Sequence, residues 1–182
     1  MNILSRLQLN HRPRLRLNSP RNIRLSRWHF SAALAAAVSV TGCGAPQAVY
    51  TVKVYDPARD PADDLAATVR AAQAANKRIV LQVGGNWCGW CHKLDRYIAE
   101  HPAVAEALHD NFVIMKVNRS DENDNAEFLA HYPKIPGYPH WYVLESDGAL
   151  LYSQGTAELE EGGSYSESAL VEFLRAWSGQ AV

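Results

Sequence analysis

Continuous apolar segments alternate along the chain with segments whose apolar residues have helical spacing, and this pattern predicts alternating strands and helices. The segments RIVLQV (78–83) and FVIMKV (112–117) are nearly continuous in apolar residues, which is typical of strands buried on both faces of a sheet. A Ser-Asp-Gly turn joins two further β-rich segments and predicts a hairpin. The expected elements are strands at 49–54, 78–83, 112–117, 140–145 and 149–154, and helices at 61–76, around Leu94 and Ile98, at 102–109, around Phe128 and Leu129, and near the C-terminal end.

Two of these helices carry start signals. At 60–63, Asp-Pro-Ala-Asp places a proline at the first helical position and acidic residues in the first turn. Near the C-terminal end, Ser164 and Glu167 have the spacing of a capping box, so we expect the last helix to begin there, after a flexible loop at 160–164. The apolar face of that helix has helical spacing and consists of Leu170, Phe173, Leu174 and Trp177.

The first 42 residues differ in composition from the rest of the chain. They contain seven arginines and no acidic residue, whereas the other 140 residues carry eight more acidic than basic side chains. An all-basic leader before an acidic body indicates a targeting segment and not a nucleic-acid-binding patch. Residues 28–40 are apolar and Ala-rich, but these 13 residues are too few for an ordinary transmembrane helix, and they fit the apolar part of a secretory signal.

The four residues VTGC (40–43) resemble the lipobox of bacterial lipoproteins. Such a sequence implies that Cys43 is acylated and becomes the N-terminal residue; the alternative is a simple cleavage nearby, with Cys43 incidental. Gly44 is not the Asp that retains enterobacterial lipoproteins in the inner membrane, which favours the outer membrane. We therefore predict a signal peptide at 1–42, a lipidated Cys with a tether and a first strand at 43–59, and one domain at 60–182.

Of the three cysteines, Cys88 and Cys91 remain once Cys43 is assigned to the lipid. A disulfide between them would close a loop too small to stabilise the fold much, so chemistry explains the pair better. C-x-x-C predicts a redox-active dithiol. With His92 the motif becomes C-x-x-C-H, which is also the attachment site of a c-type haem, and a zinc corner is a third interpretation.

The predicted order β-α-β-α-β-α-β-β-α, with the cysteines where a central strand becomes a helix, resembles the thioredoxin fold. This is an α/β fold with a central mixed sheet flanked by helices. The resemblance covers about residues 60–178 and is closest to exported thioredoxin-like proteins related to the C-terminal domain of the DsbD electron carrier. It rests on NWCGWC (86–91), KVN (116–118) and GYPHWYVL (137–144).

The resemblance implies a cis-proline beside the dithiol at Pro139, with the backbone of Tyr138 free to pair with a substrate. The alternative is that Pro139 only begins an edge strand. Trp87 is expected at the rim of the site, partly as packing. Trp90 stands where thioredoxins commonly have proline.

A thiolate attacks disulfides, and the start of a helix favours the thiolate. Cys88 is therefore the expected nucleophile, and Cys91, one turn further along the helix, is the expected resolving thiol.

One position departs from the family pattern. Thioredoxins commonly bury an Asp six residues before the first Cys, and this chain has Gln82 there, while the lysine usually opposite it is retained as Lys116. Gln cannot accept the proton of the resolving thiol, and His92 is the nearest titratable residue in sequence. Because His92 directly follows Cys91, its side chain should point away from that thiol, so a solvent-facing role is the alternative to proton transfer. A solvated helix face is expected to consist of Lys93, Asp95 and Arg96.

These features together predict a periplasmic, lipid-anchored thiol–disulfide oxidoreductase, acting as a reductase and needing no bound cofactor. The expected partners are disulfide-containing periplasmic proteins, a thiol electron donor and the membrane through Cys43. A c-type cytochrome is the first alternative, although those domains are largely helical and Met115 falls in a buried strand; the histidines that could replace a Met ligand are His101, His109, His131 and His140. A redox-inactive binding module is the second alternative.

Overall fold

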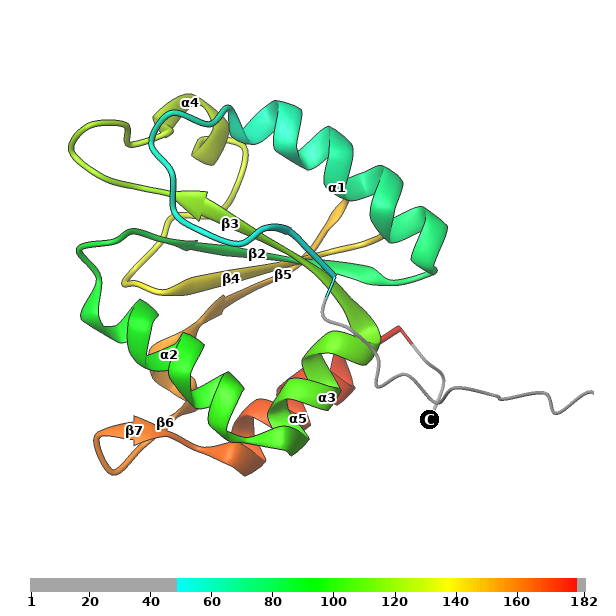
Figure 1. Ribbon diagram of the computed structural model, residues 1–182, viewed down its shortest axis with the longest axis vertical. Helices are drawn as coiled ribbons and strands as arrows, with labels where there is room; N and C mark the ends of the chain where they lie inside the picture. Colours follow the sequence, from blue (N-terminus) through cyan, green and yellow to red (C-terminus); the bar gives the residue numbers. More distant parts are fainter. Residues whose placement is uncertain (1–48, 180–182) are drawn as a thin grey trace, which may run out of the picture. The chain divides into compact units, whose positions relative to one another are not determined.

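Five strands form one mixed sheet, in the order β1-β3-β2-β4-β5 (Figure 1). The structure is a computed structural model and describes residues 49–179. β1, β3 and β2 run parallel to one another, β4 runs antiparallel to β2, and β5 runs antiparallel to β4. In this order β2 lies at the centre of the sheet. The strands are β1 (Val49–Val52), β2 (Arg78–Gly84), β3 (Phe112–Asn118), β4 (His140–Leu144) and β5 (Leu150–Gly155).

Helices cover both faces of this sheet. Figure 1 shows α1 and α4 over one face and α2, α3 and α5 over the other. The fold is thus α/β with a mixed central sheet flanked by helices, which confirms the fold class predicted from the sequence. The helices are α1 (Pro61–Ala75), α2 (Gly89–Glu100), α3 (Pro102–Asn111), α4 (Ala126–Leu129) and α5 (Glu167–Ala176), and a short 3-10 turn covers Thr156–Leu159.

The side chains of β2 alternate between two cores. Ile79, Leu81 and Val83 join the core under α1, whereas Val80 joins the core under α2, α3 and α5. Because successive side chains of a strand point to opposite faces, Gln82 lies on the same side as Val80, facing α2. Burial of both faces explains why this segment is nearly continuous in apolar residues.

The start of α1 agrees with its sequence signal. The side chain of Asp60 accepts hydrogen bonds from the backbone N–H groups of Ala62 and Asp63, at 2.8 and 3.4 Å. Pro61 occupies the first helical position. These contacts satisfy donors that the first turn of a helix otherwise leaves without partners.

The predicted start of the last helix was wrong. α5 begins at Glu167, with Ser166 at the cap position, and Ser164 instead belongs to a strand. The segment expected as a flexible loop is a small hairpin of β6 (Glu160–Glu161) and β7 (Ser164–Tyr165). Its turn consists of two glycines with positive φ, of 59° and 80°, a conformation that favours a tight hairpin over an early helix start.

The predicted signal peptide and Cys43 lie outside the described residues. Within residues 49–179, no helix combines the length and the apolar character that a membrane span requires. The expected first strand is present as β1, which pairs in parallel with β3.

The buried side chain of His140 gives a prediction about stability at low pH. Its Nε2 lies 2.8 Å from Ser153 Oγ, its Nδ1 has no partner among the described residues, and burial lowers its pKa to about 4. An unfolded chain binds this proton below about pH 6.5, so the native state is expected to lose about 2–3 kcal/mol of stability as the pH falls from 6.5 to 4. Urea unfolding at several pH values should show a shallower loss for His140→Phe; an unchanged slope would contradict the assignment.

Candidate active site

Cys88 and Cys91 are joined by a disulfide at the start of α2. The sulfurs are 2.11 Å apart and the Cα atoms 5.2 Å apart. Cys88 is the N-cap residue of α2, and its sulfur accepts a hydrogen bond from the backbone N–H of Cys91 at 3.1 Å. The strand-to-helix junction predicted from the sequence therefore places the first sulfur beside the unpaired N–H groups of a helix.

The two cysteines are both buried, but not equally. Cys88 is 3% exposed and Cys91 is 0% exposed. Half-buried Tyr138 and Trp90 pack against them. A partner can therefore reach Cys88 only by docking closely, and Cys91 is out of direct reach.

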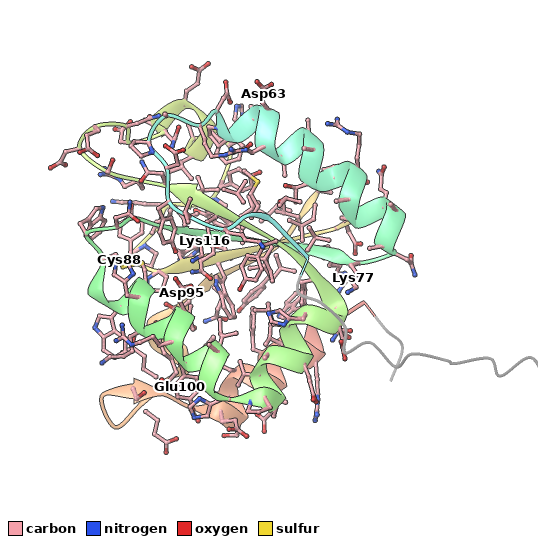
Figure 2. All side chains as sticks on the ribbon, viewed as in Figure 1. Asp63, Lys77, Cys88, Asp95, Glu100 and Lys116 are labelled. Atoms are coloured by element: carbon pink, nitrogen blue, oxygen red, sulfur yellow. A yellow bond between two sulfur atoms is a disulfide. The ribbon has the colours of Figure 1, made fainter. Side chains whose placement is uncertain are left out.

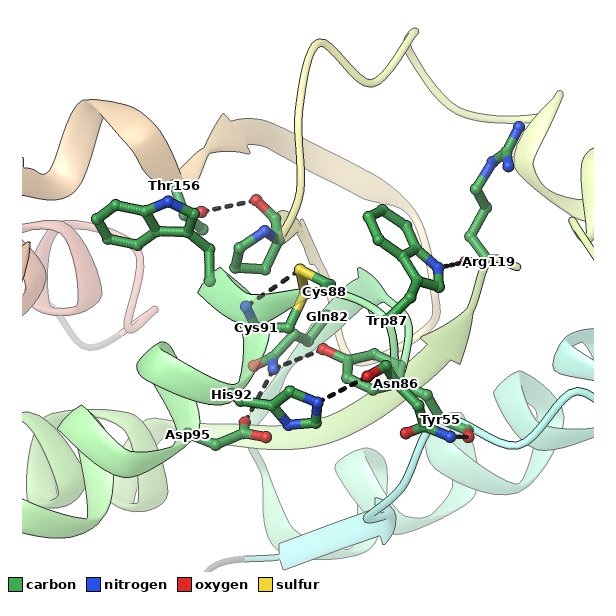
Figure 3. The surroundings of a disulfide bond; sticks show 12 residues. Tyr55, Gln82, Asn86, Trp87, Cys88, Cys91, His92, Asp95, Arg119 and Thr156 are labelled. Carbon is green, nitrogen blue, oxygen red and sulfur yellow. Dashed lines mark hydrogen bonds between the residues drawn. A yellow bond between two sulfur atoms is a disulfide. The ribbon is translucent and has the colours of Figure 1, made fainter. Parts of the chain in front are cut away.

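Trp87 is the most exposed aromatic side chain of this region, at 58%. Its indole N–H donates to the backbone oxygen of Arg119 at 2.7 Å (Figure 3). Its ring meets that of Tyr138 edge to face, with the ring centres 5.5 Å apart. The ring is therefore held in place although it faces solvent. This geometry agrees with the rim position expected for Trp87.

Pro139 directly follows Tyr138, which packs against the cysteines. The Tyr138–Pro139 peptide bond is cis, as the resemblance to thioredoxins implied. Pro139 is buried directly before β4, and its carbonyl oxygen accepts a hydrogen bond from Thr156 Oγ1 at 2.6 Å (Figure 3).

Gln82 takes the place of the expected carboxylate and is fully hydrogen-bonded. Its amide nitrogen donates to Tyr55 Oη at 2.8 Å and to Asp95 Oδ1 at 3.1 Å. Its amide oxygen accepts from Trp141 Nε1 at 3.2 Å. The side chain is only 1% exposed, so these bonds satisfy polar atoms that burial would otherwise leave unpaired.

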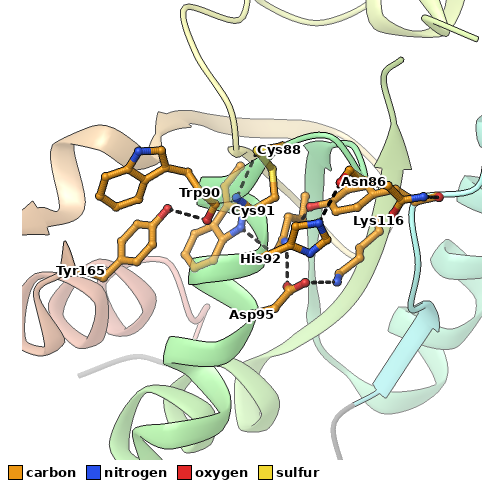
Figure 4. A network of polar contacts seen from close by, with 11 residues as sticks. Asn86, Cys88, Trp90, Cys91, His92, Asp95, Lys116 and Tyr165 are labelled. Atoms are coloured by element: carbon orange, nitrogen blue, oxygen red, sulfur yellow. Dashed lines mark hydrogen bonds and ion pairs between the residues drawn. A yellow bond between two sulfur atoms is a disulfide. The ribbon is translucent and has the colours of Figure 1, made fainter. Parts of the chain in front are cut away.

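The prediction that Asp95 lies on a solvated helix face was wrong. Its Oδ2 accepts from Lys116 Nζ at 2.6 Å, and the two side chains are 30% and 9% exposed (Figure 4). Figure 2 shows Asp95 on the side of α2 that faces the sheet. Asp95 is four residues after Cys91, so both lie on one helix face, and this spacing was the signal that the sequence offered. A carboxylate therefore does approach the site, from the helix and not from β2.

Lys93 and Arg96, the other two residues expected on the solvated helix face, differ in exposure: Lys93 is half-buried and Arg96 is exposed. Lys93 Nζ lies 3.8 Å from the centre of the Trp90 ring and donates to the backbone oxygen of Gly163 at 2.8 Å. Arg96 is exposed, as expected.

His92 is exposed and lies over the loop before Cys88. Its Nε2 is 2.9 Å from the backbone oxygen of Asn86 (Figure 4). This position agrees with the solvent-facing alternative. A role of His92 in proton transfer stays a prediction.

Tyr55 is the residue of the site that the sequence did not reveal. It lies between β1 and α1, is 3% exposed, and belongs to the same buried cluster as Cys88 and Cys91. It directly follows the segment expected as the first strand, and only the folded chain brings it to the cysteines.

The described residues offer no arrangement of three or more His, Cys, Asp or Glu side chains that could hold a metal ion. The two sulfurs and the polar network beside them supply the groups that thiol–disulfide exchange needs.

Parts of the chain are similar in sequence to known proteins, including thioredoxin-like ones. A family model described as thioredoxin-like matches residues 60–146. DsbD of Pseudomonas fluorescens, a thiol:disulfide interchange protein, is 28% identical over 121 residues, which are 66% of this chain and 19% of that protein. An uncharacterized protein of Caenorhabditis elegans is 37% identical over 71 residues, which are 38% of this chain and 10% of that protein. The chain thus spans between a tenth and a fifth of the length of these relatives.

Solved structures are similar over most of the described residues. A disulphide isomerase from Xylella fastidiosa Temecula1 has a TM-score of 0.58 at 23% identity, covering 68% of this chain and 96% of that one. The reduced C-terminal domain of DsbD from Neisseria meningitidis has a TM-score of 0.50 at 21% identity, covering 65% and 96%. These similarities identify the fold as that of thioredoxin. The described residues therefore have a thioredoxin-like fold, with a C-x-x-C pair at the start of α2.

Proposed function

We propose that the protein is a thiol–disulfide oxidoreductase that reduces disulfides of partner proteins through Cys88 and Cys91. The observation that carries this proposal is the disulfide at the helix start, with Cys88, the slightly more exposed cysteine, at the N-cap. The similarity to a thiol:disulfide interchange protein supports the same class of reaction.

The first step is attack by the Cys88 thiolate on a partner disulfide. The Cys88 sulfur forms a bond to one partner sulfur, the partner's S–S bond breaks, and the other partner sulfur leaves as a thiolate that takes up a proton. The N–H of Cys91, which contacts the Cys88 sulfur at 3.1 Å, and the helix start favour the anionic form of this nucleophile.

The second step releases the partner. The thiolate of Cys91 attacks the Cys88 sulfur, the bond between Cys88 and the partner breaks, and two electrons pass to the partner's sulfur. The protein is left as the disulfide seen in the structure. A thiol donor must then reduce it again before another cycle.

The partner binds along the rim formed by Trp87, Trp90 and Tyr138, beside Pro139. In this proposal the backbone of Tyr138 pairs with an extended segment of the substrate. The exposed ring of Trp87 supplies apolar contact area next to the buried sulfurs.

The proposed location is the periplasmic side of a bacterial outer membrane, with an acyl chain on Cys43. The arginine-rich leader, the short apolar segment and VTGC at 40–43 support export and lipidation. The similarity to DsbD supports an exported protein of disulfide chemistry.

Reduction of insulin by dithiothreitol in the presence of the purified protein tests the reaction. Wild type should accelerate insulin reduction, and Cys88→Ser should not. The matched variant Cys43→Ser should accelerate it like wild type, while its molecular mass should lack that of the lipid.

Absence of acceleration by wild type would refute the proposed oxidoreductase activity. A Soret band in the absorbance spectrum of the purified protein would favour the haem alternative. A reduction potential of about −270 mV for the Cys88–Cys91 pair would support a reductase, and one of about −120 mV an oxidase.

A further inference from the structure

Tyr55 and Cys91 meet at one point of the central strand. A Cβ atom built on Gly84 would lie 2.5 Å from the Cys91 sulfur and 3.0 Å from Tyr55 Oη. Both groups therefore lie against the backbone of Gly84, which has no side chain, at the end of β2. Tyr55 and Cys91 also share one buried cluster, and they are only 3% and 0% exposed.

Three contacts from different elements hold Tyr55 in this place. Asn86 Nδ2, from the loop before α2, donates to the backbone oxygen of Tyr55 at 2.9 Å. Lys116 Nζ, from β3, lies 5.1 Å from the centre of its ring. Gln82 Nε2, from β2, donates to its hydroxyl at 2.8 Å. A side chain that is fixed at its backbone, its ring and its tip has little freedom to leave the dithiol.

The orientation of Gln82 decides what the Tyr55 hydroxyl can do. Trp141 Nε1 can only donate, so the amide oxygen of Gln82 must face it, and the amide nitrogen must face Tyr55 and the Asp95 carboxylate. The Tyr55 oxygen is therefore an acceptor towards Gln82, and its own proton is available to another acceptor. Burial raises the pKa of this phenol above its usual value, so the proton stays on the oxygen throughout the neutral range.

We propose that Tyr55 donates a hydrogen bond to the sulfur of Cys91 once the disulfide is reduced, and so favours the thiolate that resolves the mixed disulfide. This inference rests on the proposed function. In the resolving step the bond between Cys91 and Cys88 forms, the bond between Cys88 and the partner breaks, and the electron pair leaves with the partner's sulfur. Tyr55 keeps its proton and acts as a positioning residue that stabilises the attacking anion.

The other titratable groups around Tyr55 do not offer the same contact. Asp95 of α2 and Lys116 of β3 bond to each other at 2.6 Å, so their charges largely oppose one another. Burial raises the pKa of Tyr50 in β1 and of Tyr165 in β7 to about 12, so both stay neutral.

Tyr55→Phe tests the proposal, with Tyr50→Phe as the matched control in the same N-terminal segment. The NMR chemical shift of the Cys91 Cβ, followed against pH in the full-length reduced protein, reports ionisation of that thiol directly. A hydrogen bond to a charged sulfur predicts about a tenfold loss of Cys91 thiolate at neutral pH in Tyr55→Phe and no change in Tyr50→Phe. The release rate of a preformed mixed disulfide should fall about tenfold at pH 7 and recover at higher pH, where the thiol ionises without help.

A second variant keeps the shape of the site. Replacing Tyr55 with 3-fluorotyrosine retains the hydroxyl and makes it a stronger donor, so the midpoint of Cys91 ionisation should move to lower pH. An unchanged midpoint in both variants, or a release rate that falls equally at all pH values, would overturn the proposal. Because the NMR titration needs no partner, a failure of wild type in the insulin assay would refute the oxidoreductase separately.

Discussion

Replacing Cys91 with serine is expected to convert the protein into a covalent trap for its partners. Cys88 can still attack, but no second thiol is present to break the mixed disulfide, so each molecule should stop after one attack. We expect turnover to fall by at least about a hundredfold and a 1:1 protein–partner adduct to accumulate. Non-reducing gel electrophoresis followed by mass spectrometry measures the adduct, and added thiol should release it.

The reverse replacement provides the control. In Cys88→Ser the remaining thiol among the described residues is Cys91, which is 0% exposed. We expect no adduct from that variant under the same conditions. Equal trapping by both variants would mean that the two sulfurs do not have the separate roles assigned to them.

Gly84→Ala is expected to disrupt the packing of Cys91 and Tyr55 against the end of β2. The new methyl group would lie 2.5 Å from the Cys91 sulfur, closer than van der Waals contact allows, and 3.0 Å from Tyr55 Oη. The backbone cannot easily retreat, because Gly84 pairs with Asn118 and its carbonyl accepts a hydrogen bond from the N–H of Arg119 at 2.7 Å. Overpacking of this kind costs about 1–3 kcal/mol of stability, and it should also displace Cys91 and slow disulfide exchange.

Gly155→Ala in β5 is the matched replacement. A methyl group there would have its nearest neighbour at 3.7 Å, which is an ordinary contact. Urea unfolding and the insulin assay on both variants measure the difference. Equal stability and equal activity would show that the packing at Gly84 does not constrain the dithiol.

Local patterns along the chain predicted most of the architecture. The central strands were recognisable because helices cover both their faces, which makes their sequences continuously apolar. The position of Cys88 was also predictable, because a strand, a glycine break and a helix follow one another within a few residues. The error at Ser164 arose where two local signals competed, and the hairpin turn at the two glycines prevailed over the capping pattern.

The polar network was harder to predict, because its contacts join distant parts of the chain. Gln82 bonds to side chains 27 residues before it and 59 residues after it, and no local pattern indicates such pairs. The helical spacing of Asp95 from Cys91 does indicate that it faces the site, but the charged residues next to it in sequence favour a solvated face. Tyr55 gave no local signal at all.

The parallel pairing of β1 bears on how a tethered molecule would be oriented. Val49 pairs with Val113 near the beginning of β3, whereas the cysteines follow the far end of β2, where Gly84 pairs with Asn118. The first described strand thus begins at one end of the sheet, and the cysteines follow the opposite end. In the proposed lipid-anchored protein, the tether would thus join the domain at the end of the sheet opposite the reactive cysteines.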